Sequence, residues 1–200
     1  MTKLVLKTIA ITLIAVLGAC FITFGSLALF APKSLADFFD GLGMYKSSII
    51  YYEKQYGKSE DIEDLAVLVL KIDDESDSEK AEKYLKVMIE SSDFESYCQA
   101  ENARSSGLKI TLDEFYKGKY AVALVRNDKF DLAMDFANDC VSNGYKKNNP
   151  FSLIISEFGQ SFTKEQLENL RTEISAYVDG ENGNMASADI SVINQLIDNK

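Results

Sequence analysis

The feature that most limits what this chain can fold into is an uncharged run near the N-terminus, from Thr8 to Ala31. Twelve of its 24 residues are Ile, Leu, Val or Phe, and as a helix the run extends about 36 Å. That length crosses a hydrocarbon core of about 30 Å with some tilt. The sequence therefore predicts a short N-terminal segment, 1–7, and a transmembrane helix or signal anchor, 8–32, whose partner is the lipid bilayer.

The charges that flank this run predict how it is oriented. Lys3 and Lys7 precede it, whereas Lys33 is followed at once by Asp37 and Asp40. Because positive residues are retained on the cytoplasmic side of a membrane span, we expect a cytoplasmic N-terminus. The rest of the chain is then extracytoplasmic, and the protein is a single-pass protein of the cell membrane.

Two other ways of processing the run stay open. The segment Leu17-Gly18-Ala19-Cys20 resembles a bacterial lipoprotein signal, in which Cys20 would be lipidated. The uncharged run continues for eleven residues beyond Cys20, which favours a retained helix instead. Ser34-Leu35-Ala36 offers a third route, cleavage by a signal peptidase, although the apolar region is longer than such signals usually have. All three routes export the remainder of the chain.

The composition of the exported part excludes several classes of function. It carries 19 of the 21 Lys and Arg residues and all 31 Asp and Glu residues, a formal charge of −12. Such a surface repels phosphate backbones, so nucleic acid is not an expected partner. Histidine is absent, which removes Ser-His and Cys-His nucleophile pairs and imidazole metal ligands. We expect a non-catalytic protein without a cofactor or a metal site.

Helical periodicity dominates after residue 33, with apolar residues recurring every three or four positions. The chain has only 2 prolines and 11 glycines, too few for the many turns of a β-sandwich or barrel. Thr163 and Gln166 form the pattern of a capping box at a helix start. A last helix is expected over Ser187 to Ile197. The predicted fold class is all-α.

Residues 29–62 carry a pattern of large, small and aromatic residues on two successive helices. The members are Leu35, Ala36, Phe39, Gly43, Tyr45, Ser48 and Tyr52. This order resembles the tetratricopeptide repeat, and weaker copies begin 33 residues and then a further 52 residues along the chain. The resemblance implies antiparallel helix pairs stacked in a right-handed solenoid. The alternative is an irregular helical bundle.

The resemblance also suggests a division of the chain into regions. Helical repeats occupy 33–145, with an insertion near 93–109 that accounts for the longer spacing before the third copy. A C-terminal helical extension occupies 146–200. A solenoid of this kind implies a protein or peptide partner bound along its surface.

Several residues are candidates for particular roles. Cys98 and Cys140 are the only exported cysteines under the retained-helix interpretation, and they either form a disulfide or remain buried thiols. Tyr51, Tyr56 and Tyr116 are candidates for contacts with a partner. The function that follows is a membrane-anchored, extracytoplasmic helical scaffold. The alternative is an envelope lipoprotein, lipidated at Cys20, that binds a small ligand or calcium.

Overall fold

The computed structural model describes residues 2–74, 77–105 and 110–200, and within these ranges it contains helices and no strands. Helices make up 80% of the described residues, so the predicted all-α class is confirmed. The chain divides into two compact units, Met1–Glu75 and Ser76–Lys200, which are described separately below. The division falls inside the predicted repeat region rather than at its end.

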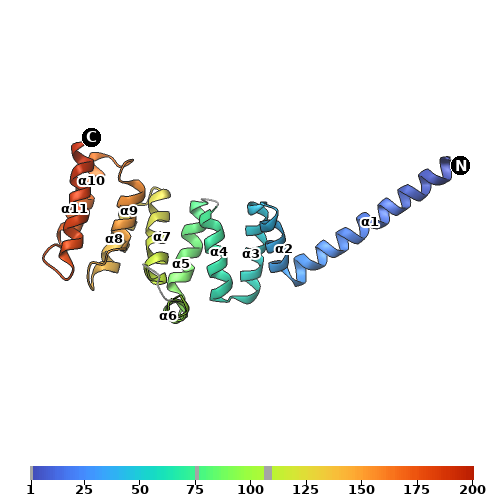
Figure 1. Cartoon of the computed structure of the whole chain (residues 1–200), viewed down its shortest axis with the longest axis horizontal. Helices are drawn as coiled ribbons and strands as arrows, with labels where there is room; N and C mark the ends of the chain where they lie inside the picture. Colours follow the sequence, from blue (N-terminus) through green and yellow to red (C-terminus); the bar gives the residue numbers. More distant parts are fainter. Residues whose placement is uncertain (1, 75–76, 106–109) are drawn as a thin grey trace. The chain divides into compact units, whose positions relative to one another are not determined.

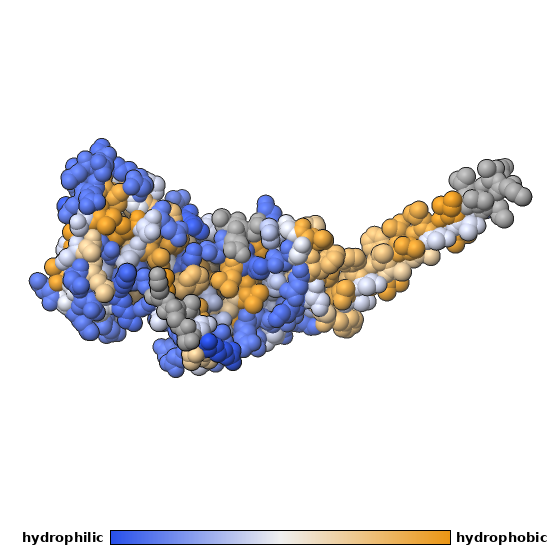
Figure 2. Space-filling view, in the orientation of Figure 1, coloured by the Kyte–Doolittle hydropathy of each residue, from blue (hydrophilic) through white to orange (hydrophobic). Residues whose placement is uncertain are grey.

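The N-terminal helix α1 (Thr2–Phe30) is long, apolar and exposed. The most apolar 18-residue stretch within Lys7–Phe30 has a mean hydropathy of 2.4, and no residue of that stretch is buried in the protein. Figure 2 shows apolar residues along most of its length. By length and composition α1 is the one helix in the described residues that is apolar enough to cross a membrane. It ends before Pro32, which opens the next helix.

Three further helices complete the first unit (Figure 1): α2 (Pro32–Gly41), α3 (Tyr45–Ser59) and α4 (Ile62–Asp74). Gly43 has a φ of 71°, the left-handed conformation that allows the short turn between α2 and α3. The core between the helices is apolar and closely packed, since these side chains are almost completely buried. Its members are Leu35, Ala36, Ile49, Tyr52, Leu65, Leu68 and Ile72.

The second unit contains seven helices in its described residues. They are α5 (Ser78–Glu90), α6 (Phe94–Arg104), α7 (Leu112–Arg126), α8 (Phe130–Val141), α9 (Pro150–Phe158), α10 (Lys164–Ser175) and α11 (Gly183–Asp198). Helix α7 is central, because it packs against α5, α6, α8 and α9, and α10 packs against α11. Helix α6 lies in the segment predicted as an insertion, of which residues 106–109 are outside the described ranges.

Local signals explain where several of these helices begin. Thr163 and Gln166 form the predicted capping box at α10, and the Asn149 side chain accepts hydrogen bonds from the backbone N–H groups of Phe151 and Ser152 at α9. The last helix was predicted to begin at Ser187 but begins at Gly183. A side chain on Gly183 would place its Cβ 1.8 Å from the carbonyl oxygen of Val178. Only glycine therefore fits this early start.

Candidate functional site

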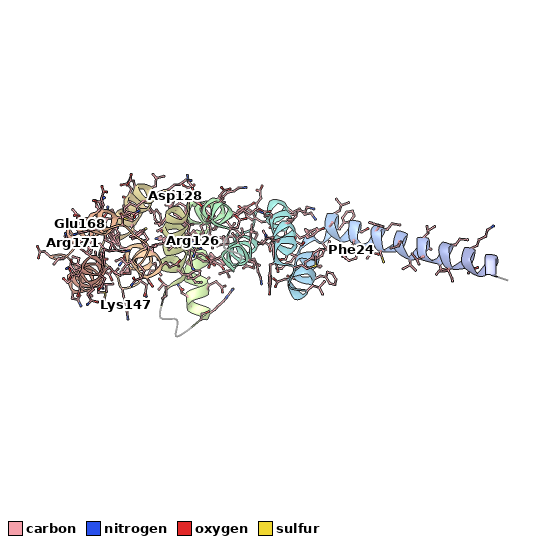
Figure 3. The ribbon with its side chains drawn as sticks, turned by 90° about the horizontal axis from the view of Figure 1, so that it is seen from above. Phe24, Arg126, Asp128, Lys147, Glu168 and Arg171 are labelled. Atoms are coloured by element: carbon pink, nitrogen blue, oxygen red, sulfur yellow. The ribbon has the colours of Figure 1, made fainter. Side chains whose placement is uncertain are left out.

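The second unit has an open pocket of about 530 Å³ where the first turn of α5 approaches the turn between α7 and α8. Its lining is polar and carries both signs of charge. The lining residues are Ser78, Glu79, Glu82, Lys83, Arg126, Asn127, Asp128 and Lys129. We call it the α5–α8 pocket. Figure 3 labels Arg126 and Asp128, which mark the α7 side of the pocket.

Glu82 is the centre of this lining. Its carboxylate accepts hydrogen bonds from the Lys129 ammonium at 2.7 and 2.8 Å and from the Asn127 side-chain amide at 2.7 Å. The Asn127 amide also donates to the backbone oxygen of Ser78 at 3.0 Å. Burial alone would raise the pKa of Glu82, but the hydrogen bonds from Lys129 and Asn127 outweigh it, so the pKa is lowered. Glu82 therefore connects α5 to the α7–α8 turn through its carboxylate.

The local sequence explains how the two sides of the pocket are formed. Asp77 caps α5, its side chain accepting a hydrogen bond from the Lys80 backbone at 3.2 Å. On the other side, α7 ends at Arg126, and Asp128 adopts a left-handed φ of 58° that turns the chain into α8. Asp tolerates this conformation better than most residues. Both helix ends therefore present charged and polar groups to one space.

The pocket suits recognition of a polar, charged segment. Glu79, Lys83 and Asp128 are exposed, and the Lys83 ammonium lies 4.7 Å from the ring centre of Tyr84. Arg126 forms an ion pair of 2.7 Å with Glu157 of α9, so its charge is partly neutralised. What remains at the rim is a mixture of acidic and basic groups, which can bind complementary charges on a partner.

The three tyrosines predicted to contact a partner do not form one surface. Tyr116 is 1% exposed and lies against Phe94 in the core of the second unit, so the prediction that it contacts a partner is wrong. Tyr51, in the first unit, stacks on Phe39 with ring centres 5.5 Å apart. Tyr56 is half-buried on the same helix as Tyr51. Only these two keep exposed area for a partner.

The cysteines are free thiols in the structure. Cys98 is 2% exposed on α6, and Cys140 is half-buried on α8. Burial raises the pKa of each thiol to about 11, and Lys117 of α7 acts on both in the opposite direction. A disulfide between them stays a prediction from the sequence. Cys20 is exposed on α1, which runs on unbroken to Phe30, and its lipidation likewise stays a prediction.

Within the described residues, no group of three or more His, Cys, Asp or Glu side chains is arranged to hold a metal ion. The calcium alternative stays a prediction from the sequence. The sequence also has an acidic run from Asp73 to Glu79, of which residues 75–76 lie outside the described ranges.

The fold and the apolar helix place the chain in a broad class, an all-helical protein with one N-terminal helix suited to crossing a membrane. Comparison with protein-family models, with curated proteins and with solved structures gives no match. The function is therefore inferred from the surfaces of the protein itself.

The α5–α8 pocket was not anticipated from the sequence. Asn127 and Asp128 are recognisable as the end of a helix, but Glu82 lies 45 residues before Asn127. Periodicity places residues on a helix face and does not reveal which distant turn that face approaches. Charged residues do cluster in the sequence at the start of α5 and at the end of α7. No spacing rule predicts that these two clusters approach each other.

Proposed function

We propose that this protein is a membrane-anchored helical scaffold, in which α1 crosses the bilayer and the helices after it bind a protein or peptide partner outside the cytoplasm. The observation that carries the proposal is the uncharged, apolar part of α1 from Thr8 onward, whose most apolar stretch contains no buried residue. An exposed apolar helix of this length is unfavourable in water and is stabilised by lipid.

The charges of the chain support an outward orientation. Two lysines precede the apolar run, and the acidic residues all follow it. The positive-inside rule then places the acidic part on the far side of the membrane.

The α5–α8 pocket is the proposed binding site for the partner. Its volume of about 530 Å³ falls in the range of ligand-binding pockets, roughly 300–1,000 Å³. Its lining of charged and polar residues favours a charged peptide segment over an apolar small molecule. A segment that carries both acidic and basic side chains would complement Lys83 and Glu79 together.

Site-specific photocrosslinking tests this proposal in membranes that contain the full-length protein. A photoreactive residue replaces Glu79, exposed at the pocket, or Lys147, exposed outside its lining. We expect one reproducible protein adduct from position 79 and none of that mass from position 147. Introducing Lys83→Glu into the variant with the photoreactive residue at position 79 should remove the adduct, because this substitution reverses a charge in the pocket. The same adduct from both positions, or none from position 79, contradicts the proposal.

A further inference from the structure

Helix α2 carries an exposed apolar face that the helical core does not use. Phe38 is 49% exposed and Leu42, at the end of the helix, is 59% exposed. Residues four apart lie on the same side of a helix, so these two form one stripe. Met44 and Tyr45, each 47% exposed, continue it around the turn into α3. We call these four residues the α2 apolar face.

The α2 apolar face is continuous with the surface of α1. The rings of Phe24 in α1 and Phe38 in α2 meet edge to face, with centres 6.0 Å apart. Figure 3 shows Phe24 where α1 meets α2, and Figure 2 shows apolar surface extending from α1 onto the adjoining helix. Helix α3 also contacts the end of α1, since the Lys58 ammonium donates a hydrogen bond to the carbonyl oxygen of Phe30 at 3.4 Å.

The contact between Phe24 and Phe38 shows which part of α1 lies beside α2. Phe24 precedes the last residue of α1 by six positions, which is about 9 Å along a helix. Helix α2 therefore lies beside the last turns of α1 rather than beyond its end. The part of α1 from Lys7 to Phe24 spans about 26 Å at the same rise per residue. That length nearly matches a hydrocarbon core of about 30 Å, which leaves the last turns of α1 for the interfacial layer.

The acidic residues of α2 are directed to the protein. The Tyr52 hydroxyl of α3 donates to Asp37 at 2.7 Å, and the Lys71 ammonium of α4 donates to Asp40 at 2.8 Å. Residues 31–50 contain two lysines and two aspartates and are therefore neutral, in a chain with a formal charge of −10. The α2 apolar face consequently meets a membrane without the charge repulsion that the rest of the acidic surface would produce.

We propose that the α2 apolar face lies in the outer interfacial layer of the bilayer, with Phe38 at the depth of Phe24. Phe and Leu side chains on an amphipathic helix are suited to this layer, where they bury apolar area beneath the headgroups. The first unit is then seated on the membrane surface by α2 instead of being connected to it only through α1. This inference rests on the proposed membrane span of α1.

Tryptophan fluorescence tests it directly, because the chain contains no tryptophan. Three variants of the full-length protein are reconstituted separately into phosphatidylcholine vesicles: Phe24→Trp in α1, Phe38→Trp in α2 and Leu132→Trp on the exposed surface of α8. Their emission is compared with that in vesicles whose acyl chains carry bromine near the headgroup. We expect a similar loss of emission for F24W and F38W, and no loss for L132W.

The outcomes separate this inference from the proposal on which it depends. Quenching of F24W without quenching of F38W overturns the inference and leaves the membrane span intact, whereas unquenched emission from both at the wavelength of water-exposed tryptophan contradicts both. Unquenched F38W with a blue-shifted emission means that protein, such as a second copy of the chain, covers the face, and this also overturns the inference. If F38W loses helical circular dichroism, L42W on the same face replaces it, with the same expected loss of emission.

Discussion

At the scale of single residues, the structure distinguishes charged groups that connect helices from exposed charged groups that pair only within their own helix. Glu82 and Glu90 both lie on α5 and both form ion pairs. The side chain of Glu82 is 19% exposed and joins α5 to the α7–α8 turn. Glu90 is 66% exposed and pairs within its own helix with Lys86. Exposed pairs of the second kind contribute little to stability.

We predict that Glu82→Gln lowers the free energy of unfolding by about 1 kcal/mol at pH 7, because it removes a charge-assisted contact with Lys129. The pKa of Glu82 is lowered in the folded protein, so its contribution is present above the unfolded pKa of about 4.3. It disappears as the pH falls through the folded pKa. Urea unfolding followed by circular dichroism measures the difference at pH 7 and at pH 3.

Glu90→Gln provides the matched control and should change the free energy of unfolding by less than about 0.5 kcal/mol at either pH. Equal losses for the two variants would contradict the role assigned to Glu82, as would a loss in E82Q that is no smaller at pH 3 than at pH 7.

The buried thiols give a second test at this scale. Because the pKa values of Cys98 and Cys140 are raised to about 11, almost no thiolate is present at neutral pH, and the thiolate is the reactive form. We expect slow alkylation by iodoacetamide in the folded protein and rapid alkylation after unfolding in urea, followed by mass spectrometry. A mass lower by two hydrogen atoms before reduction would establish the disulfide instead.

At the scale of helices and turns, capping signals act locally and were therefore readable from the sequence. The capping box of Thr163 and Gln166 needs only residues three apart. By contrast, the burial of Tyr116 depends on Phe94, 22 positions earlier, and on the packing of α6 against α7. The sequence therefore predicted the helical class and several boundaries, but not which tyrosine is buried or which turn completes the pocket.

The capping box makes a quantitative prediction. Thr163→Ala should lower the free energy of unfolding by about 1 kcal/mol, because the N–H group of Gln166 loses its acceptor. Thr172→Ala, in the exposed middle of the same helix, should be neutral or slightly stabilising, since alanine has the higher helix propensity. Thermal unfolding of both variants checks this, and a larger loss in T172A would contradict it.

Gly183 makes the corresponding prediction for a turn. Gly183→Ala should lower the free energy of unfolding by about 1–3 kcal/mol, because the new Cβ would overlap the Val178 carbonyl. Gly180→Ala is the control, since its Cβ would approach its nearest atom, the Tyr177 carbonyl oxygen, at 3.4 Å. Hydrogen exchange of α11 should increase in G183A and remain nearly unchanged in G180A. Similar exchange in the two variants would show that close contact does not fix the start of the helix.

At the scale of the whole molecule, one apolar helix is followed by acidic helical units that have their own cores. No residue in the most apolar stretch of this helix is buried, and its contacts with α2 and α3 lie near its C-terminal end, whereas the following helices bury their apolar residues against one another. This contrast is what a membrane span followed by a water-exposed part requires. It also predicts that removing residues 1–31 converts the protein from a detergent-requiring form to one that stays in solution.

The central claim is that α1 crosses the membrane and holds the acidic helices outside the cytoplasm. Digestion of intact bacterial spheroplasts that express the full-length chain, by a protease added outside, tests it most directly. The account predicts that residues 33–200 are degraded without lysis, while a membrane-embedded fragment containing α1 survives. Protection of the whole chain until the membrane is broken, or its recovery in the soluble fraction without detergent, would contradict it.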